Sequence, residues 1–387
     1  MNGKQRIAST ISHKKTDRAP LAYEATFEVT ETLVKYFGLD KMPELQGSQV
    51  STFHDPSIGE KALGLQHEIA LQKLLGVDLA TVACPLNSKK TIGNWFGMPL
   101  VRKEKDGTII GAWDMRFREY EYQSGTYIEL DGYPLANAEM NELERHPLPE
   151  IDLFDYDLLK EVVPNYSDFY ILLNMNGCFD FARYMRGTEQ FLMDLALEPQ
   201  KAEVLLEKVN DFAMAYLDKC MEKCAGMIDG VYCGDDFGTQ RGLIFSPDIW
   251  RKYMKPRYKK LVEKVHSYGL KYCHHTCGGV RPIIRDLIEV GFDILNPIQP
   301  LAIGMEPAEL AEEFGKDITF YGAIDEQQTL PYGKPQDVKN EVNERLRTLG
   351  KHNGYIVAPS HGFQPDTPIE NILAMYEAVL GYQPGTK

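Results

Sequence analysis

Residues 270–299 read LKYCHHTCGGVRPIIRDLIEVGFDILNPIQ, and this stretch decides the fold class. The run LKYCHHTCG is short and ends in glycine, VRPIIRDLIEVG carries apolar residues at helical spacing, and FDILNPIQ is a second short apolar run. Two strands that alternate with a helix are typical of parallel pairing. The stretch therefore predicts one strand–helix–strand unit of an α/β protein.

The same rhythm extends over the whole chain. Eight strand-like runs are bounded by polar or glycine signals: APLAYEA (19–25), DLATVAC (78–84), FYILLNMNG (169–177), MIDGVYCGDD (227–236), LKYCHHTCG (270–278), FDILNPIQ (292–299), DITFYGAID (317–325) and GYIVAPSHG (354–362). Helical patterns separate the later runs, and the chain lacks the G-x-G-x-x-G turn expected of an open dinucleotide-binding sheet. Eight strand–helix repeats predict a closed (β/α)₈ barrel.

Residues 94–157 interrupt this rhythm. They are rich in aromatic and β-branched residues, and KDGT and LDGY are turn signals. We predict an inserted antiparallel hairpin or small sheet after the second strand, where it would form a cap over the catalytic face of the barrel. With this insertion, residues 1–387 are predicted to form a single domain.

Charge and composition exclude several classes of function. The net charge of −14 disfavours nucleic acid as a partner, because binding to phosphates needs clustered Lys and Arg. No apolar run approaches twenty residues, and the first twenty residues lack the apolar core of a secretion signal. Seven cysteines scattered through apolar segments indicate reduced thiols. These features predict a cytoplasmic protein without membrane spans.

Polar residues follow most of the predicted strands. In a barrel these ends converge on one mouth, where small-molecule sites form. The residues at these ends are Asn174, Asn176, Asp235, Asp236, His275, Cys277, Asn296, Gln299, Asp325, Gln327, His361 and Gln364.

The pattern His-x-Cys could provide half of a metal site. His275 and Cys277 would point to the same face of an extended strand. Together with His361 from the eighth run, they could bind zinc and leave a fourth position open, as catalytic zinc requires. Two alternatives remain at this point: a polar strand end that only resembles a metal site, and a His361 that is an ordinary core histidine.

The acidic candidates have structural alternatives as well. Asp235 and Asp236 could form a carboxylate pair that holds a proton or a cation, or they could cap a turn or pair with Arg241. Asp325 could act at the site or cap the helical turn that follows it.

At these residues the chain resembles the uroporphyrinogen decarboxylase superfamily. The similar blocks are DRAPLAYE, GDDFGTQRGLIFSPDIWRKYMKP, HHTCGGVRPIIRDLIEVGFDILNPIQP, YGAIDEQQTLPYG and SHGFQPDTPIENILAMYEAV. The resemblance implies a (β/α)₈ barrel, in agreement with the number of predicted strands. The true decarboxylases carry an arginine-rich RQAGRY block after the first strand, whereas this chain has the acidic YEATFEVTETL.

The resemblance extends to the corrinoid-dependent methyltransferases of this superfamily. The coenzyme M enzymes hold zinc with a His-x-Cys on the fifth strand and a cysteine on the eighth. This chain matches the first part with His275 and Cys277, but it has His361 at the third position, as the decarboxylases do. The resemblance implies a methyltransferase that acts with a corrinoid on a separate partner protein, with zinc as a further cofactor.

Our hypothesis is a transfer of methyl from a small methylated donor, preferably an aryl methyl ether, to the Co(I) corrinoid of that partner. The catalytic candidates are Asp235, Asp236, His275, Asp325 and His361, and the substrate-binding candidates are Tyr23, Phe27, Asn176, Phe179, Gln299 and Gln364. Trp95, Phe117 and Tyr120 are further candidates for a ring-binding wall. The alternatives are a methylcobamide:thiol methyltransferase, a uroporphyrinogen-type decarboxylase, and a non-catalytic barrel that binds a tetrapyrrole or corrinoid. The resembled family also suggests a homodimer.

Overall fold

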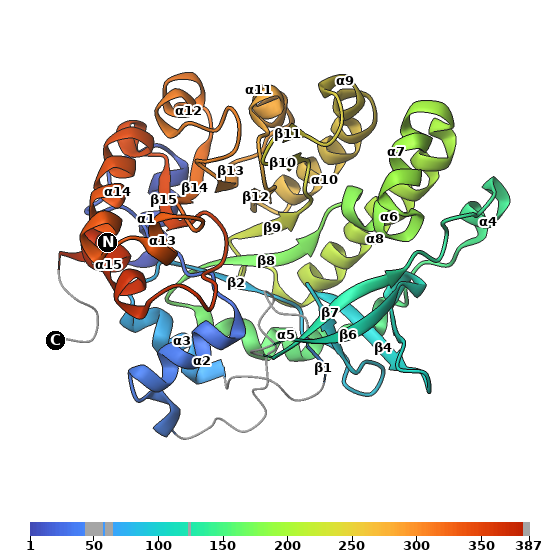
Figure 1. Ribbon diagram of the computed structural model, residues 1–387, viewed down its shortest axis with the longest axis horizontal. Coiled ribbons are helices and arrows are strands. Elements are labelled where there is room, and N and C mark those ends of the chain that lie inside the picture. Colours follow the sequence, from blue (N-terminus) through green and yellow to red (C-terminus); the bar gives the residue numbers. More distant parts are fainter. Residues whose placement is uncertain (43–56, 59–64, 123–124, 382–387) are drawn as a thin grey trace.

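The computed structural model describes residues 1–42, 57–58, 65–122 and 125–381. Seven parallel strands form one curved sheet in the order β15-β14-β13-β12-β9-β8-β2 (Figure 1). Their bounds are β2 (Leu79–Val82), β8 (Tyr170–Asn176), β9 (Gly230–Gly234), β12 (Lys271–His275), β13 (Ile294–Ile298), β14 (Thr319–Ile324) and β15 (Tyr355–Pro359). The predicted α/β class with parallel strands is therefore confirmed.

The first predicted strand is reduced to single bridges. Leu21 bridges Val357 of β15, and Ala22 bridges Leu79 of β2, both in parallel. The segment thus lies between the two edge strands of the sheet, and the amide of Ala22 donates to the carbonyl of Val357 at 3.0 Å. A complete eighth strand that closes the barrel stays a prediction.

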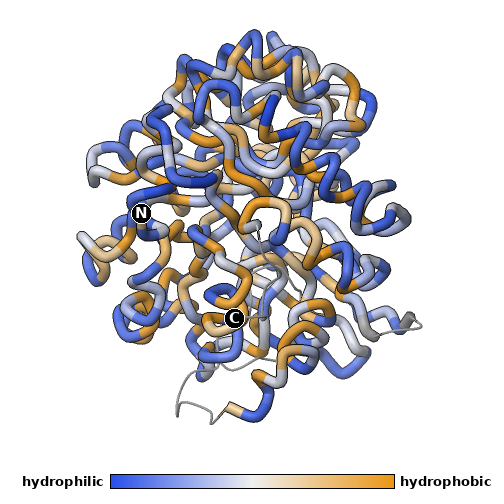
Figure 2. Tube along the Cα trace, turned by 90° about the vertical axis from the view of Figure 1, so that its left-hand side faces the viewer, coloured by the Kyte–Doolittle hydropathy of each residue, from blue (hydrophilic) through white to orange (hydrophobic). Residues whose placement is uncertain are grey.

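Most of the helices lie outside the sheet (Figure 1). Hydrophilic and hydrophobic residues alternate along them, as expected of helices that are half solvated (Figure 2). The helices are α1 (Gly3–Ile11), α2 (Phe27–Tyr36), α3 (Leu65–Leu74), α4 (Met140–Arg145), α5 (Tyr156–Val162), α6 (Phe179–Arg186), α7 (Thr188–Leu197), α8 (Pro199–Cys224), α9 (Pro247–Ile249), α10 (Lys255–Ser267), α11 (Arg281–Val290), α12 (Pro307–Phe314), α13 (Thr329–Tyr332), α14 (Pro335–Thr348) and α15 (Ile369–Leu380). Among the helices that the structure describes, none combines the length and the apolar character needed to cross a bilayer.

The interior of the curved sheet has its own apolar core. It contains Leu172, Ile294 and Ile356 from the strands, and Ile7 and Ile11 of α1 join the same cluster. Because side chains alternate along a strand, residues two and four positions further along point to the same side. The polar residues at the strand ends therefore follow directly on this apolar core.

A second, antiparallel sheet is formed mainly by residues between β2 and β8 in the sequence. Its order is β1-β3-β4-β5-β6-β7, formed by β1 (Ser57–Ile58), β3 (Gly93–Trp95), β4 (Met98–Lys103), β5 (Ile109–Gly111), β6 (Arg116–Tyr122) and β7 (Gly125–Gly132). Its position in the chain agrees with the predicted insertion, apart from β1, which precedes β2. The role of this sheet as a cap, and the single-domain organisation, stay predictions.

Candidate functional site

The structure brings together the three residues predicted to bind a metal. His275 ends β12, Cys277 lies two residues beyond it, and His361 follows β15. Nε2 of His275 is 3.5 Å from Sγ of Cys277, and the rings of His275 and His361 have centroids 5.8 Å apart. One donor atom from each of the three residues lies within 4.8 Å of the others.

This donor set fits zinc. Two ligands on a tetrahedral zinc, one nitrogen and one sulfur, are separated by roughly 3.6 Å, which follows from bond lengths of about 2.05 and 2.3 Å. The observed distance between Nε2 and Sγ is 3.5 Å. Nδ1 of His275 is engaged elsewhere, 2.7 Å from Oδ1 of Asn296, so that Nε2 is the nitrogen that faces the cluster. The predicted set of two imidazoles and one thiol thus has suitable geometry.

The surroundings of the cluster favour its uncharged forms. Burial, followed by the carboxylates of Asp236 and Glu326, raises the pKa of the Cys277 thiol. Burial and the neighbouring His275 lower the pKa of His361 to about 4, although its ring is open to solvent at the mouth of the sheet. A bound cation would reverse the preference at Cys277 and stabilise the thiolate.

Asp236 is the carboxylate closest to the cluster. Its Oδ1 accepts the backbone N–H of Cys277 at 2.8 Å and lies 3.9 Å from Nε2 of His275. Asp180, which the sequence interpretation missed, accepts the backbone N–H of Asp236 at 3.0 Å and pairs with Arg183 at 2.7 Å. Burial raises the pKa of Asp180 to about 6, although Arg183 opposes the shift. Asp236 is therefore held in place while its side chain remains 35% exposed.

Asp235 has a structural role, and its prediction as a catalytic residue is corrected here. It is 1% exposed and accepts the backbone N–H groups of Phe179 and Asp180 at 2.6 and 2.7 Å, where α6 begins. The hydroxyl of Tyr258 donates to the same carboxylate. Burial, followed by the charge of Asp180, raises the pKa of Asp235. Because these donors surround the carboxylate, it has no access to a substrate.

We expect Asp235→Ala to lower the free energy of unfolding by about 3 kcal/mol, since the substitution leaves two buried amide donors and a buried hydroxyl without their acceptor. Urea denaturation would measure the change. Asp248→Ala is the matched control, because the Asp248 side chain is 90% exposed. A loss of less than about 1 kcal/mol, the size of one ordinary hydrogen bond, would contradict the structural role.

Several other predicted site residues are used by the fold itself. The Asp325 carboxylate accepts the N–H groups of residues 327, 328 and 329, which is the capping alternative. The Gln299 side chain accepts from Gln240 and from the backbone of Gly278, both at 2.9 Å, and so connects neighbouring loops. These contacts give Asp325 and Gln299 a structural role, and their predicted roles in catalysis and substrate binding stay predictions.

The aromatic candidates are dispersed. Phe179 is fully buried and packs against Phe191 and Phe245, so its predicted substrate contact is wrong. Among the other candidates, Phe117 and Trp95 are buried in the core, whereas Tyr120 on β6 is 47% exposed and Gln364 is exposed. The hydroxyl of Tyr23 lies 2.9 Å from Oγ1 of Thr30. Phe27 begins α2 and is half-buried.

Open space lies next to His275 inside the mouth. Gly234 is in register with Asn176 of β8 on one side and with His275 of β12 on the other. A Cβ atom built on Gly234 would have no heavy atom within 4 Å. Because paired residues of parallel strands point to the same side, this space lies between the Asn176 and His275 side chains.

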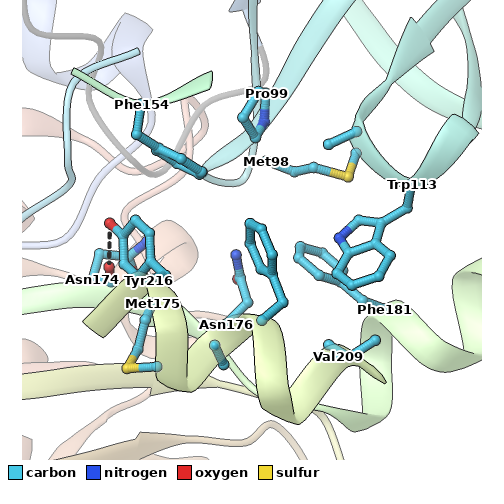
Figure 3. A pocket seen from close by; sticks show the side chains of 14 residues that line it. Met98, Pro99, Trp113, Phe154, Asn174, Met175, Asn176, Phe181, Val209 and Tyr216 are labelled. Carbon is cyan, nitrogen blue, oxygen red and sulfur yellow. Dashed lines mark hydrogen bonds between the residues drawn. The ribbon is translucent and has the colours of Figure 1, made fainter. Parts of the chain in front are cut away.

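A separate small cavity adjoins Asn176. Met98, Pro99 and Trp113 of the antiparallel region face Asn176 and the α8 residue Val209 across it (Figure 3). Its volume of about 40 Å³ is well below the roughly 150 Å³ of an apolar cavity that accepts benzene. It therefore suits a group of a few atoms and not an aromatic ring.

Exposed apolar side chains lie in the loop that follows β13 and at the end of α13, which follows β14. Leu301 is 53%, Ile303 65% and Tyr332 74% exposed. We call these three residues the apolar rim. Ile303 donates its backbone N–H to the carbonyl of Gln240 at 3.1 Å, so its loop is fixed to the hairpin that follows β9.

Sequence interpretation also missed polar residues behind the cluster. Glu24 and Tyr232 are 4% and 2% exposed. The Tyr232 hydroxyl lies 2.6 Å from Nδ1 of His275, and Glu24 connects to His275 through Asn296. Glu326, after β14, has a buried Oε2 without a hydrogen-bond partner among the described residues, and burial raises the pKa of Glu326 to about 8. Strand alternation would have indicated Glu24, which lies two residues after the inward-facing Ala22.

Comparison with known proteins points to one protein family. The family description "Uroporphyrinogen decarboxylase (URO-D)" matches residues 118–382. A uroporphyrinogen decarboxylase from Chlorobaculum tepidum is 27% identical over 47% of this chain and 49% of its own length. The methylcobamide:CoM methyltransferase MtaA from Methanosarcina barkeri is 26% identical over 64% of this chain and 67% of its own length. The match thus spans about half the length of the decarboxylase.

A solved structure shows the same fold over nearly the whole chain. A methyltransferase from Methanosarcina mazei superposes with a TM-score of 0.64 and covers 98% of both chains. Its sequence identity to this chain is 19%. This likeness supports the fold and leaves the activity to be argued from the site.

Proposed function

The chain belongs to the uroporphyrinogen decarboxylase family, and on that premise we propose that it is a methyltransferase that acts with a corrinoid-carrying partner protein. The observation that carries this proposal is the cluster of His275, Cys277 and His361, with donor atoms within 4.8 Å of one another. Similarity to a methylcobamide:CoM methyltransferase supports the same class of reaction. The preferred methyl donor is an aryl methyl ether.

The residues around the cluster disfavour the decarboxylase alternative. A substrate with many carboxylates needs cations to receive them, and Arg183, which lies beside Asp236, already pairs with Asp180. Asp236, whose side chain is 35% exposed, instead places a carboxylate at the mouth. A neutral ether would enter such a site without the repulsion that a polycarboxylate meets.

In the proposed reaction the bond between the methyl carbon and the ether oxygen breaks, and the methyl group passes to Co(I) of the corrinoid. The oxygen leaves with the bonding electron pair and takes up one proton. Zinc, held by His275, Cys277 and His361, would supply Lewis-acid stabilisation of the charge on that oxygen. Asp236 is our candidate for relaying that proton, because its side chain is 35% exposed and its Oδ1 lies 3.9 Å from Nε2 of His275.

The test is a screen of methyl donors with a reduced corrinoid protein, followed through the absorbance change of cobalt on methylation. We expect methylation with one or more methoxyarenes and zinc in the purified protein by elemental analysis. Absence of cobalt methylation with every ether, amine and thiol tested would overturn the proposed function.

A thiol acceptor is the second candidate, and Cys277 favours it, because a soft donor set suits a zinc that activates a thiol. This alternative predicts thiol-dependent demethylation of methylcobalamin, which the ether reaction does not require. Loss of methyl from methylcobalamin only when a thiol is present would favour it over the ether donor. Retention of a corrinoid without turnover would instead favour the non-catalytic alternative.

The partner must bring its cobalt to the mouth, and the apolar rim follows β13 and β14 at that end of the sheet. We expect Ile303→Lys to slow methyl transfer to protein-bound corrinoid about tenfold or more. A tenfold loss corresponds to about 1.4 kcal/mol of binding free energy, which is typical when an interface anchor is lost. Transfer to free cobalamin should stay unchanged. Steady-state rates with both acceptors would measure the difference.

Tyr268→Lys is the matched control for this prediction. Tyr268 is 40% exposed, and it lies where α10 leads into β12, at the opposite end of the sheet. Equal losses with protein-bound and free acceptor in Ile303→Lys would count against docking at the apolar rim.

A further inference from the structure

We propose that Glu24 and Asn296 are positioning residues that hold the His275 ring with its proton on Nδ1. In this tautomer Nε2 presents its lone pair to Cys277 and His361. The purpose of this arrangement, metal binding, rests on the proposed function. The hydrogen-bond geometry that carries the inference does not depend on it.

The first step concerns the three atoms next to Nδ1 of His275. Oδ1 of Asn296 lies 2.7 Å from Nδ1, and the hydroxyl oxygen of Tyr232 lies 2.6 Å from it. The Tyr232 hydroxyl also donates to Oδ1 of Asn296 at 2.9 Å. An amide oxygen can only accept, so a short contact with Nδ1 requires a proton on that nitrogen.

The second step concerns the orientation of the Asn296 side chain. An amide could turn by half a rotation and offer its NH₂ group to Nδ1, which would favour the other tautomer. Glu24 prevents this, because Oε1 of Glu24 accepts the Asn296 Nδ2–H at 3.3 Å. Tyr321 hydrogen-bonds to the same carboxyl group and fixes it in turn. A chain of hydrogen bonds therefore runs from Tyr321 through Glu24 and Asn296 to His275, and each residue orients the next.

The third step concerns the cost of this arrangement. Asn296 is fully buried and Glu24 is 4% exposed, directly beyond the apolar interior formed by residues such as Ile294. Burial raises the pKa of Glu24, which reflects the unfavourable transfer of a carboxyl group from water. The described inward positions deeper in the sheet hold apolar residues and tyrosines such as Tyr170 and Tyr232. A carboxyl at this position therefore indicates a role beyond packing.

Two measurements on the full chain test the inference. Nitrogen-15 NMR of histidine-labelled protein without added metal reports which ring nitrogen of His275 carries the proton, with His275→Gln to assign the signal. Competition with a chromophoric chelator reports the affinity for Zn²⁺. In Asn296→Leu and Glu24→Met we expect the protonated-Nδ1 form to lose its dominance and the affinity to fall about 10- to 100-fold, the usual effect of outer-shell partners.

Matched variants separate positioning from loss of structure. Glu24→Gln keeps an oxygen that can accept from Asn296, so it should retain the tautomer and most of the affinity. Tyr170→Phe removes another buried inward hydroxyl, which donates to the backbone of Asp229 at 3.2 Å far from the cluster, and it should change neither readout. If Asn296→Leu does not fold, the tautomer and the Zn²⁺ affinity of Glu24→Met still decide whether the ring is positioned in this way.

Unchanged His275 tautomer and unchanged Zn²⁺ affinity in Glu24→Met would overturn the inference. If the unaltered protein binds no Zn²⁺, the metal role in the proposed function fails, and the NMR readout alone then decides whether Glu24 and Asn296 position the ring. A Nδ1-protonated ring that persists in Asn296→Leu would overturn the inference in that case as well.

Discussion

We expect Cys277→Ser to lower the affinity for Zn²⁺ by more than about 100-fold and to abolish the proposed methyl transfer. The reason is that it removes the soft donor of the cluster, whereas changes to outer-shell partners alone cost up to about 100-fold. The hydroxyl that replaces the thiol does not ionise at neutral pH, so it cannot take the place of a thiolate ligand. Elemental analysis after dialysis and chelator competition measure this loss.

Cys224→Ser is the matched control for the loss of a thiol. Cys224 is fully buried on α8 and is no part of the cluster. This variant should keep its zinc and its activity, even if it is less stable. Full activity of Cys277→Ser after exhaustive chelation would show that the cluster acts through hydrogen bonds and not through a metal.

Gly234→Leu should abolish activity while the fold and the bound zinc are preserved. The leucine side chain would occupy the open space between Asn176 and His275, where no atom lies within 4 Å of the new Cβ. Since that space adjoins the cluster, we expect kcat/KM to fall at least about 100-fold, a loss of roughly 2.7 kcal/mol in transition-state stabilisation. Steady-state kinetics and zinc content are the measurements.

Gly350→Leu provides the matched control, because a Cβ on Gly350 also meets no atom within 4 Å, and this glycine lies in the short helical turn 349–352 before β15. Its activity should equal that of the unaltered protein. Normal kcat/KM in a folded, zinc-loaded Gly234→Leu protein would mean that the methyl donor binds elsewhere.

The parallel sheet and the proximity of His275, Cys277 and His361 were predictable from the sequence for different reasons. Strand and helix rhythm is a local property, and 270–299 shows both periods within thirty residues. His275 and Cys277 follow from their spacing. His361 follows from the rule that ends of parallel strands meet at one edge.

Other parts of the site depend on contacts that the sequence does not display. Asp235 and Asp236 are neighbours with opposite environments, because Asp235 lies behind the sheet against Tyr258 while Asp236 reaches the mouth. Asp325 is on the inward side by alternation, yet the turn after β14 uses its carboxylate. Only the path of the chain after each strand decides such cases.

The placement of residues 21–22 between β15 and β2 has a consequence for the order in which the chain acquires its site during synthesis. These residues leave the ribosome long before Val357, which bridges Leu21 and accepts the amide of Ala22. Glu24 and His361 are subject to the same delay. His275 and Cys277 therefore lack the third proposed ligand, His361, until β15 has joined the sheet. Long-range pairing of this kind is intrinsically slow, so metal acquisition should follow the completion of folding and should not guide it.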